Sequence, residues 1–583
     1  MEKNTIIAVI LCVIVISAGY FVQAIFFPVE ETQVVKQENT EPAPAPEAPD
    51  ATESGAPIQV QVPTDTGSYQ DVTVETDVMS AVLTTKGGAV KSVKLKGHAE
   101  REGETLEMIY RKESQMNAFE LYFGDINGAP LGGAFAVNKF TQGKDTIVEF
   151  KKDVNLTVGN GTSVPVEIKK TYTFKPDEFM IELAIEFTSK NGKAINFNSN
   201  GFAYSLGFGP QIGPQFTKLD NREDFRKYLT LNGDKKKKSI KLTKSEMTKE
   251  VTGRTVWSAI SGKYFAVIGI TDATEYVISF SQLPVQGQEN ASRMFYSRPI
   301  VKSTNFIDTF KFYIGPKSSK ELRRYDNADT NGFGMTKMEL DRVLDSGAIL
   351  GWLQAILKWL LISFHKLIPN YGVAIILLTI VVKIVLYPLT KKSFESSAKM
   401  SALSPKMKEI QDKYKNNPQK LNAELAALYK REGVSPLSGC FPILLQMPIF
   451  FALYGLLNSF FELRGAGFLE PWITDLSQPD SIWNFAPTKV LFIGSDIRLL
   501  PILMAVSQII SSKLMQPAGS QGGSSQQQSQ MKMMTYAMPV IFLFVLYDVS
   551  SGLLLYWTMT NILSIGQQLY INHKQKVKAK AKA

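Results

Sequence analysis

The sequence predicts a polytopic α-helical membrane protein, with six transmembrane helices, that carries a large β-sandwich domain outside the cytoplasm. Long apolar runs are confined to the N-terminus and to the region after residue 349. Between them, residues 58–330 are rich in β-branched, alternating segments. The formal net charge of +10 is concentrated beside the apolar runs, as the positive-inside rule expects of cytoplasmic segments.

Residues 1–28 are predicted to form an N-terminal transmembrane anchor. Ile6 to Phe27 is an uncharged run of 22 residues, long enough to span a bilayer, and Lys3 before it favours a cytoplasmic N-terminus. A cleaved signal peptide is the alternative, because residues 22–24 resemble a cleavage site. The apolar run continues past that site, which favours a retained anchor. Residues 29–57, rich in Pro and acidic residues, predict a disordered linker.

Residues 58–345 are expected to form the β domain. Segments such as DVTVETDV, MIELAIEF, YFAVIGI and FKFYI recur here, and Gly, Asn and Asp turns separate them. So many strands without helical repeats predict a large β-sandwich. A short helical connector is expected at residues 331–348, before the chain reaches the membrane.

Residues 346–583 are expected to form a membrane core that begins with an interfacial helix at 349–368. Lys358, His365 and Lys366 interrupt its apolar residues, and it holds two tryptophans, which fits a helix lying at the membrane surface. The elements after it are predicted in this order: a span at 371–389, a cytoplasmic helical hairpin at 390–436, a span at 437–461, a loop outside the cytoplasm at 462–498, a span at 499–515, a cytoplasmic loop at 516–530, spans at 531–547 and 552–571, and a basic cytoplasmic tail at 572–583.

The predicted topology agrees with the distribution of charge. From a cytoplasmic N-terminus, six crossings return the C-terminus to the cytoplasm, where residues 573–583 carry five Lys and no acid. Residues 390–436 hold ten Lys or Arg against five Asp or Glu and also fall inside. The loop at 462–498 has five acidic and three basic residues and falls outside.

One charged residue, Lys383, interrupts the span at 371–389. Such a charge costs about 2.5–3.5 kcal/mol on insertion scales, and no other apolar run offers a carboxylate at matching depth. Because Lys383 lies only about 9 Å from the end of the span at about 1.5 Å per residue, a side chain that snorkels to the surface is one interpretation. A hydrated cavity inside the membrane is the other.

Polar side chains on several spans favour the cavity. Thr379 lies one turn before Lys383 and shares its helix face. The span at 437–461 contains Gln446, and the last span places a polar stripe along one face, formed by Trp557, Asn561, Ser564 and Gln568. Single buried amides often only hold helices together. Several polar stripes around one unpaired cation instead indicate a shared hydrated groove.

The hairpin segment at 390–436 is expected to hold two antiparallel helices joined at Asn417-Pro418. Its basic residues make it a candidate docking element for substrates or cytosolic factors; they include Lys406, Lys408, Lys413 and Lys415. A solvated loop without a partner is the alternative.

No motif for catalysis or for a cofactor stands out. Cys12 and Cys440 both lie in or beside apolar runs, and the three histidines are far apart in the sequence. No Gly-rich phosphate loop is present in the sequence. The sequence therefore predicts a protein that is not an enzyme and that uses no metal or other cofactor.

Three segments of the membrane core resemble the signature motifs of the YidC/Oxa-type membrane protein insertases. They read YPLTKKSFESSAKM after the span with Lys383, ALYKREGVSPLSGCFPILLQMPIFFALY at residues 427–454, and SSGLLLYWTMTNILSIGQQ near the C-terminus. The resemblance covers about residues 350–573. An N-terminal anchor followed by a large extracytoplasmic β domain is similar to the Gram-negative form of the family.

This resemblance implies a bacterial inner-membrane protein with a periplasmic β domain. Five spans would surround a groove that is closed to the outside and open to cytoplasm and lipid. The family's groove cation, usually Arg, falls on Lys383, and its polar neighbours fall on Thr379 and Gln446. The aromatic pair that contacts substrates falls on Tyr556-Trp557. Lys in place of Arg keeps the charge but lacks the planar guanidinium.

The function that the resemblance implies is that of an insertase and chaperone, which inserts, folds and helps assemble integral inner-membrane proteins, alone or with the Sec translocon. Its implied partners are nascent membrane proteins and the lipid bilayer. The basic tail and the hairpin would also suit the ribosome or the signal-recognition machinery.

Two other functions are weighed against it. A secondary transporter or channel would use Lys383 as a counter-charge for a solute, but the internal repeats usual in transporters are not evident in the sequence. A sugar-active β domain would need a pair of catalytic carboxylates, and none stands out among many scattered ones.

Overall fold

The computed structural model describes most of the chain after residue 58. The described residues are 59–61, 68–99, 105–110, 116–157, 163–209, 211–213, 225–283, 291–344, 350–414, 417–434, 441–486, 488, 494–515 and 533–580. The predicted anchor at 1–28, the predicted linker at 29–57 and the predicted cytoplasmic loop at 516–530 lie outside them.

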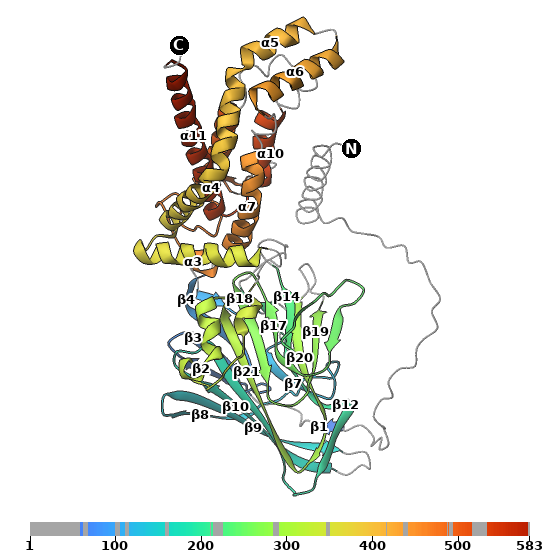
Figure 1. The fold of residues 1–583 in the computed structure, drawn as a ribbon. Helices are drawn as coiled ribbons and strands as arrows, with labels where there is room; N and C mark the ends of the chain where they lie inside the picture. The colour runs from blue at the N-terminus through green and yellow to red at the C-terminus, as the bar shows by residue number, and fades with distance from the viewer. Residues whose placement is uncertain are drawn as a thin grey trace, which may run out of the picture. The chain divides into compact units, whose positions relative to one another are not determined.

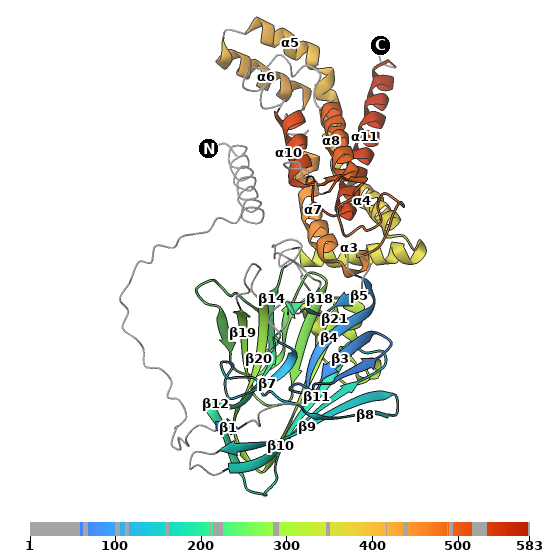
Figure 2. The ribbon, with the colours of Figure 1, turned by 180° about the vertical axis from the view of Figure 1, so that it is seen from behind.

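The β domain consists mainly of two antiparallel sheets (Figures 1 and 2). The first sheet has the order β1-β9-β10-β11-β21-β18-β17-β14-β15, with β8 paired to β9. Its strands are β1 (Gln59–Gln61), β8 (Ala136–Gln142), β9 (Asp145–Thr157), β10 (Ser163–Phe174), β11 (Met180–Ser189), β14 (Lys227–Asn232), β15 (Lys237–Ile240), β17 (Thr255–Ser261), β18 (Phe265–Thr271) and β21 (Asn305–Pro316).

The second sheet has the order β16-β19-β20-β12-β7-β4-β3-β2, with β5 paired to β4. Its strands are β2 (Asp71–Glu75), β3 (Met79–Thr84), β4 (Ala89–Ala99), β5 (Thr105–Glu107), β7 (Ala118–Phe123), β12 (Ile195–Phe208), β16 (Thr248–Val251), β19 (Val277–Leu283) and β20 (Ala291–Ser303). Two short strands, β6 (Ile109–Tyr110) and β13 (Gln211–Ile212), form a separate pair.

One hydrophobic core joins the two sheets. Strand β10 alternates strictly between inward and outward residues, as the period of a β-strand requires. Its inward side chains belong to the same buried cluster as residues of the second sheet. Across the two layers, the rings of Phe119 on β7 and Phe312 on β21 lie 4.4 Å apart, and Tyr172 donates a hydrogen bond of 2.8 Å to the carbonyl of Gly88. The predicted sandwich is therefore the observed packing of this domain.

The helical connector differs from the prediction in position and form. Short helices begin at α2 (Ser319–Arg323) and continue as η1 (Arg324–Asp326), η2 (Ala328–Thr330) and η3 (Leu340–Val343). They are held on the β domain by the buried Glu178, which accepts hydrogen bonds from the Tyr325 hydroxyl at 2.6 Å and the Gly332 amide at 2.7 Å. The prediction missed this because the partner of these turns is far away in sequence.

The C-terminal part is helical. Its helices are α3 (Gly351–Leu367), α4 (Tyr371–Ala402), α5 (Ser404–Lys413), α6 (Pro418–Glu432), α7 (Phe441–Ser459), α8 (Leu499–Met515), the π-helical η7 (Met533–Ala537), α10 (Met538–Val545) and α11 (Ser551–Lys580). Between α7 and α8 lie η5 (Phe461–Leu463), β22 (Trp483–Asn484) and β23 (Asp496–Ile497).

Among the described residues, one helical segment, Tyr371–Lys391, is long and apolar enough to cross a membrane by itself. Leu499–Leu514 and Thr535–Val545 are shorter apolar helices. The predicted span at 499–515 coincides with α8. The predicted total of six transmembrane helices is not confirmed by these lengths and stays a prediction.

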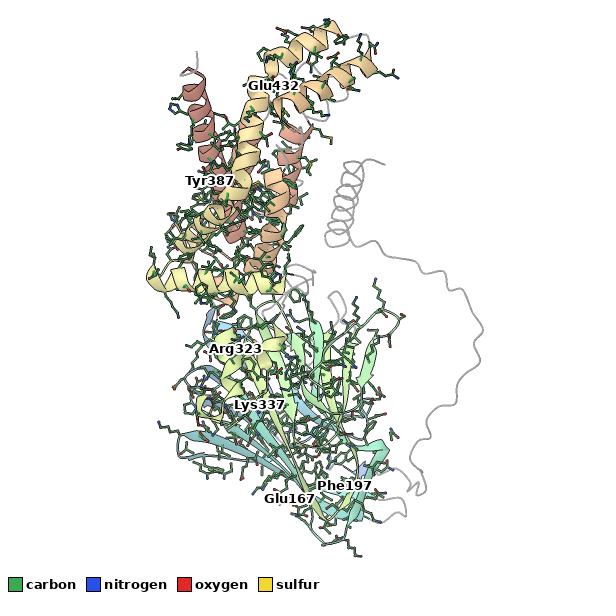
Figure 3. The ribbon with its side chains drawn as sticks, viewed as in Figure 1. Glu167, Phe197, Arg323, Lys337, Tyr387 and Glu432 are labelled. Carbon is green, nitrogen blue, oxygen red and sulfur yellow. The ribbon has the colours of Figure 1, made fainter. Side chains whose placement is uncertain are left out.

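Helix α4 continues from the predicted span at 371–389 into the hairpin segment without interruption. No glycine or capping residue stops the helix there, and Pro388 is accommodated within it. The predicted turn at 417–418 is confirmed: the Asn417 side chain accepts a 3.1 Å hydrogen bond from the Lys420 amide and caps α6. The Lys406 ammonium of α5 pairs at 3.3 Å with Glu432, the last residue of α6, which is labelled in Figure 3.

Candidate substrate groove

Lys383 points into the helical core. It lies on α4, its residue is 8% exposed, and its ammonium donates a hydrogen bond of 2.7 Å to the Ser564 hydroxyl on α11. No carboxylate lies within ion-pair distance of Lys383 among the residues that the structure describes. A side chain bonded to a facing helix is not snorkelling toward the end of its own helix. Lys383 is therefore a buried cation whose protein partner is neutral.

Thr379 lies one turn before Lys383 and is completely buried. Its hydroxyl donates a hydrogen bond of 2.7 Å to the carbonyl of Ile375 on its own helix. This is the usual way in which a threonine satisfies its hydroxyl inside an apolar helix. Thr379 thus lies beside the cation without a direct hydrogen bond to it.

The polar stripe of α11 faces both α4 and α8. Ser564 accepts from Lys383, and Asn561 donates to the Ser507 hydroxyl of α8 at 3.1 Å. Trp557 donates from its indole nitrogen to the Gln508 side chain at 3.2 Å. The sequence reasoning missed Ser507 and Gln508, although they are polar residues inside a short apolar run. The polar residues within that run, AVSQIISSK, were visible in the sequence and could have marked α8 as part of the site.

The predicted aromatic pair divides between two environments. Tyr556 is buried in the apolar cluster of the helical core, whereas Trp557 is only half-buried. The Trp557 ring contacts Phe450 of α7, with ring centroids 4.7 Å apart. Gln446, one turn before Phe450, is half-buried and has no hydrogen bond to any described residue. Helices α4, α7, α8 and α11 therefore all contribute predicted or newly found site residues.

Beyond their first turns, which bury apolar residues such as Leu500 and Leu554, two of these helices bury polar side chains and expose apolar ones. Helix α8 buries Ser507 and Ser511 but exposes Val506 and Ile510 at 48% and 45%. Helix α11 repeats the pattern: it buries Thr558, Thr560, Asn561, Ser564 and Gln568 and exposes Ile562, Leu569 and Tyr570. A water-soluble protein places these residue classes the other way round. Exposed apolar faces of this kind are suited to lipid.

Some of the buried polar atoms in this region have no protein partner. Among the described residues, Thr558 Oγ1, Gln567 Oε1 and Gln568 Oε1 are buried without a hydrogen bond. Buried polar atoms are almost always satisfied in proteins, by water where no side chain reaches them. The interior of the helical core is therefore polar enough to hold water.

The segment between α7 and α8 binds the ends of α8 and α11 at one end of the core. The Asp480 carboxylate accepts from the Leu499 and Leu500 amides at 2.8 and 3.0 Å and so caps α8. The first amides of α11, those of Ser551 and Gly552, donate at 2.7 and 2.9 Å to carbonyls of this same segment. These contacts tie the ends of both polar-lined helices to one loop.

Comparison with known proteins identifies the family. The model described as the YidC periplasmic domain matches residues 71–362, and that described as 60Kd inner membrane protein matches residues 363–580. A protein named membrane protein insertase YidC from Treponema denticola is 37% identical over 99% of this chain and 100% of its own length. The protein of the same name from Treponema pallidum is 34% identical, over 98% of each chain.

The chain belongs to the YidC family of membrane protein insertases. Its function is therefore that of a membrane protein insertase of the inner membrane rather than that of an enzyme, and its β-rich part is the family's periplasmic domain. A solved structure described as active YidC insertase covers 96% of this chain at 16% identity and a TM-score of 0.36.

The hairpin of this insertase presents most of the predicted docking lysines to solvent. Lys406, Lys408 and Lys413 are exposed, and Lys415 lies outside the described residues. Lys406 is partly occupied by its ion pair with Glu432, and Lys413 lies over the Tyr414 ring. Their role in docking stays a prediction. No cluster of His, Cys, Asp and Glu that could hold a metal ion occurs in the described ranges.

Proposed function

We propose that this insertase moves polar segments of its substrates through a hydrated groove lined by α4, α7, α8 and α11, with Lys383 as a transient counter-charge. The observation that carries the proposal is the reversed polarity of α8 and α11, with buried hydroxyls and amides and exposed aliphatic residues. The buried ammonium of Lys383, bonded only to a neutral hydroxyl, supports it.

The physical role of the groove is to shorten the apolar barrier. A polar tail must otherwise cross about 30 Å of hydrocarbon. Two opposite charges about 4 Å apart attract by about 1 kcal/mol in bulk water and by about 4 kcal/mol at an effective dielectric constant of about 20. Lys383 would therefore attract an acidic residue of the tail more strongly inside the groove than it would in bulk water. The apolar helix of the substrate then leaves sideways into lipid, and its burial there drives the reaction.

The proposed topology has six spans, with both termini in the cytoplasm and the groove open to cytoplasm and lipid. Support comes from the basic residues of the hairpin and tail. The loop that binds the ends of α8 and α11 is acidic overall and would close the periplasmic end. Chaperone activity, cooperation with the Sec translocon and contacts with the ribosome or signal-recognition machinery belong to the same proposal.

A depletion experiment tests this proposal. A bacterial host depleted of its own insertase would express this chain, and insertion of a single-span substrate with an acidic N-terminal tail would be followed by protease protection. We expect insertion with the wild-type chain and a large loss with Lys383→Glu. The matched control is Lys366→Glu, an exposed lysine of α3, which should insert normally. Equal insertion by the wild type and Lys383→Glu would refute the counter-charge.

The transporter alternative is not favoured, because the chain belongs to the insertase family, although a lysine without an ion pair would also suit a small anion. It predicts that an anionic solute crosses liposomes containing the purified chain. Solute uptake that Lys383→Gln abolishes, with no protein insertion, would favour the transporter.

A further inference from the structure

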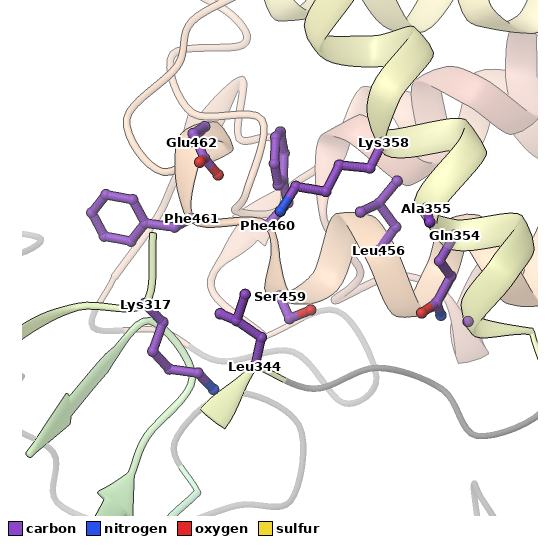
Figure 4. Close-up of a pocket in the computed structure, with 11 residues that line it drawn as sticks. Lys317, Leu344, Gln354, Ala355, Lys358, Leu456, Ser459, Phe460, Phe461 and Glu462 are labelled. Carbon is purple, nitrogen blue, oxygen red and sulfur yellow. The ribbon is translucent and has the colours of Figure 1, made fainter. Parts of the chain in front are cut away.

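A cavity of about 160 Å³ lies between α3, the end of α7 and the last strand of the β domain (Figure 4). Its polar lining includes Lys358 from α3, Glu462 from η5 and Lys317, which follows β21. Its apolar lining includes Leu344 and Leu456. At about 30 Å³ per water, the cavity has room for roughly five waters or for a small charged headgroup.

Lys358 and Glu462 face this cavity without pairing to each other. The Lys358 ammonium forms no hydrogen bond or ion pair with any described residue, and it lies 5.4 Å from the centroid of the Phe460 ring. Glu462 accepts one long hydrogen bond of 3.5 Å from the Ser318 hydroxyl. Lys317 is buried and donates to the carbonyl of Gly262 at 2.9 Å. The cavity is therefore lined by an ammonium group without an ion pair and by a carboxylate that accepts only one long hydrogen bond.

The helix beside the cavity is suited to a membrane surface. Helix α3 buries Leu357 and Leu361 on one face and exposes Trp352 and Trp359, at 66% each, on the opposite one. Exposed tryptophans of an amphipathic helix favour the level of lipid headgroups. Lys358 lies on the flank between the buried and exposed faces, so the cavity would open near that level.

Small residues of α3 leave this space free. Gly351 and Ala355 are one turn apart and both line the cavity. A Cβ atom added at Gly351 would meet no atom within 4 Å. The space is thus available to a ligand, and a larger side chain could fill it without breaking existing packing.

We propose that this cavity binds the headgroup of a zwitterionic phospholipid of the ethanolamine type, with the phosphate on Lys358 and the ammonium on Glu462. A purely anionic headgroup would meet the Glu462 carboxylate, whereas a phosphoethanolamine group carries both complementary charges. The inference rests on the interfacial position of α3 in the proposed topology. It adds a lipid site that the insertion mechanism does not require.

Lipid retention measured by native mass spectrometry tests this site. The purified full-length chain, stripped of lipid in detergent, would be incubated with vesicles of phosphatidylethanolamine, phosphatidylglycerol or phosphatidylcholine. We expect one tightly retained phosphatidylethanolamine. Lys358→Met should bind it at least about tenfold more weakly, since the phosphate loses a hydrogen bond from a charged group. Lys366→Met, on the same helix but exposed, should bind like the wild type.

Two further variants make the result specific. Glu462→Gln should move the preference from phosphatidylethanolamine to phosphatidylglycerol, because the repelling carboxylate is gone. Ala355→Leu keeps Lys358 but fills the cavity, so it should lose the lipid even if Lys358→Met folds poorly. Inorganic phosphate should not displace the lipid.

Equal retention by Lys358→Met and the wild type would overturn the site, as would displacement by inorganic phosphate or a wild-type preference for phosphatidylglycerol. Because no substrate is present in this assay, its failure would leave the groove proposal standing. A failed insertion assay would in turn leave the lipid result unaffected.

Discussion

Lys383 could be singled out from sequence alone, but its environment could not. One charge in an apolar run is visible in the sequence, and the absence of a carboxylate in the other runs indicates a missing ion-pair partner. The residue that receives its hydrogen bond, Ser564, is 181 positions away. Serine in a span has no strong signature, since it is also common where two helices pack closely. Only the fold connects the two.

A second buried cation, Lys170, lies in the β domain. It takes an inward position in the alternation of β10 and is completely buried. Its ammonium donates to the carbonyls of Gly87 at 3.2 Å and Phe119 at 2.7 Å. Burial lowers its pKa from 10.5 to about 7. Alternation predicted the strand, but a lysine at a core position contradicts that pattern, so sequence reasoning missed it.

Lys170 predicts a pH-dependent stability of the β domain. Below pH 7 the Lys170 side chain is protonated in both the folded and the unfolded state. Between about pH 7 and 10.5 it is protonated only in the unfolded state. The free energy of unfolding should therefore rise with pH in this window, by at most about 1.4 kcal/mol per pH unit. Hydrogen exchange of β10 in the full chain, corrected for intrinsic rates, should show this rise between pH 7 and 9.

The control for this prediction lies on the same strand. Lys169→Met changes an outward lysine that pairs with Glu186 at 2.6 Å, and it should leave the rise intact. Lys170→Met should remove it. If exchange in Lys170→Met depends on pH as in the wild type, another group causes the effect.

At the scale of elements, the polar residues that α8 and α11 bury indicate a hydrated interior. Their polarity is reversed relative to a soluble helix, as the burial of Ser507 beside the exposed Val506 illustrates. The sequence indicated polar stripes but could not tell which side faced inward. That assignment needed the packing of α4, α8 and α11 against one another.

Cysteine labelling tests the orientation of α8. In a chain with Cys12 and Cys440 replaced by Ser, Ser507→Cys should react with a small charged methanethiosulfonate faster than Val506→Cys. A thiol reacts as the thiolate, which needs water, and only the inward position would have it. Equal rates at the two neighbouring positions, or faster reaction at Val506→Cys, would argue against a hydrated interior.

The cap of α8 predicts a local effect on stability. Asp480→Ala removes the acceptor of two first-turn amides and of the Trp472 indole. Loss of such a cap costs about 0.5–2 kcal/mol, so hydrogen exchange in the first turn of α8 should accelerate. Asp480→Asn keeps an oxygen acceptor and should have a smaller effect. Unchanged exchange in Asp480→Ala would show that the end of α8 is held by other contacts.

Element boundaries were predictable where the sequence carries a local signal. Helix α8 has the predicted bounds, and Asn417 caps α6 at the predicted turn. No local signal marks the end of a span within a longer helix, and α4 continues from its apolar part to Ala402. Helix α11 likewise continues past the predicted span at 552–571 to Lys580.

At the scale of the whole molecule, charge asymmetry and fold class were the most predictable features. Two basic segments account for the net charge of +10, and the β-strands of the β domain precede the helices α3 to α11 along the chain. The lipid cavity could not be predicted, because its lining comes from segments as distant as residues 317, 358 and 462. Distant residues meet only in the folded chain.

The proposed topology predicts that the C-terminus lies in the cytoplasm. Green fluorescent protein fused after Ala583 should fluoresce, because it folds in the cytoplasm, while alkaline phosphatase at the same site should be inactive. The reverse outcome would place the C-terminus outside the cytoplasm and would refute the proposed topology. A fusion within the periplasmic loop at 462–498 should give the opposite pattern and serves as the control.

The central claim is that Lys383 acts as a counter-charge for passing substrate tails, and reciprocal charge exchange in liposomes tests it most directly. Purified wild-type chain and Lys383→Glu would each be given a single-span substrate with an acidic tail and the same substrate with a basic tail. We predict that the wild type favours the acidic tail and that Lys383→Glu favours the basic one. The same preference in both proteins would contradict the claim.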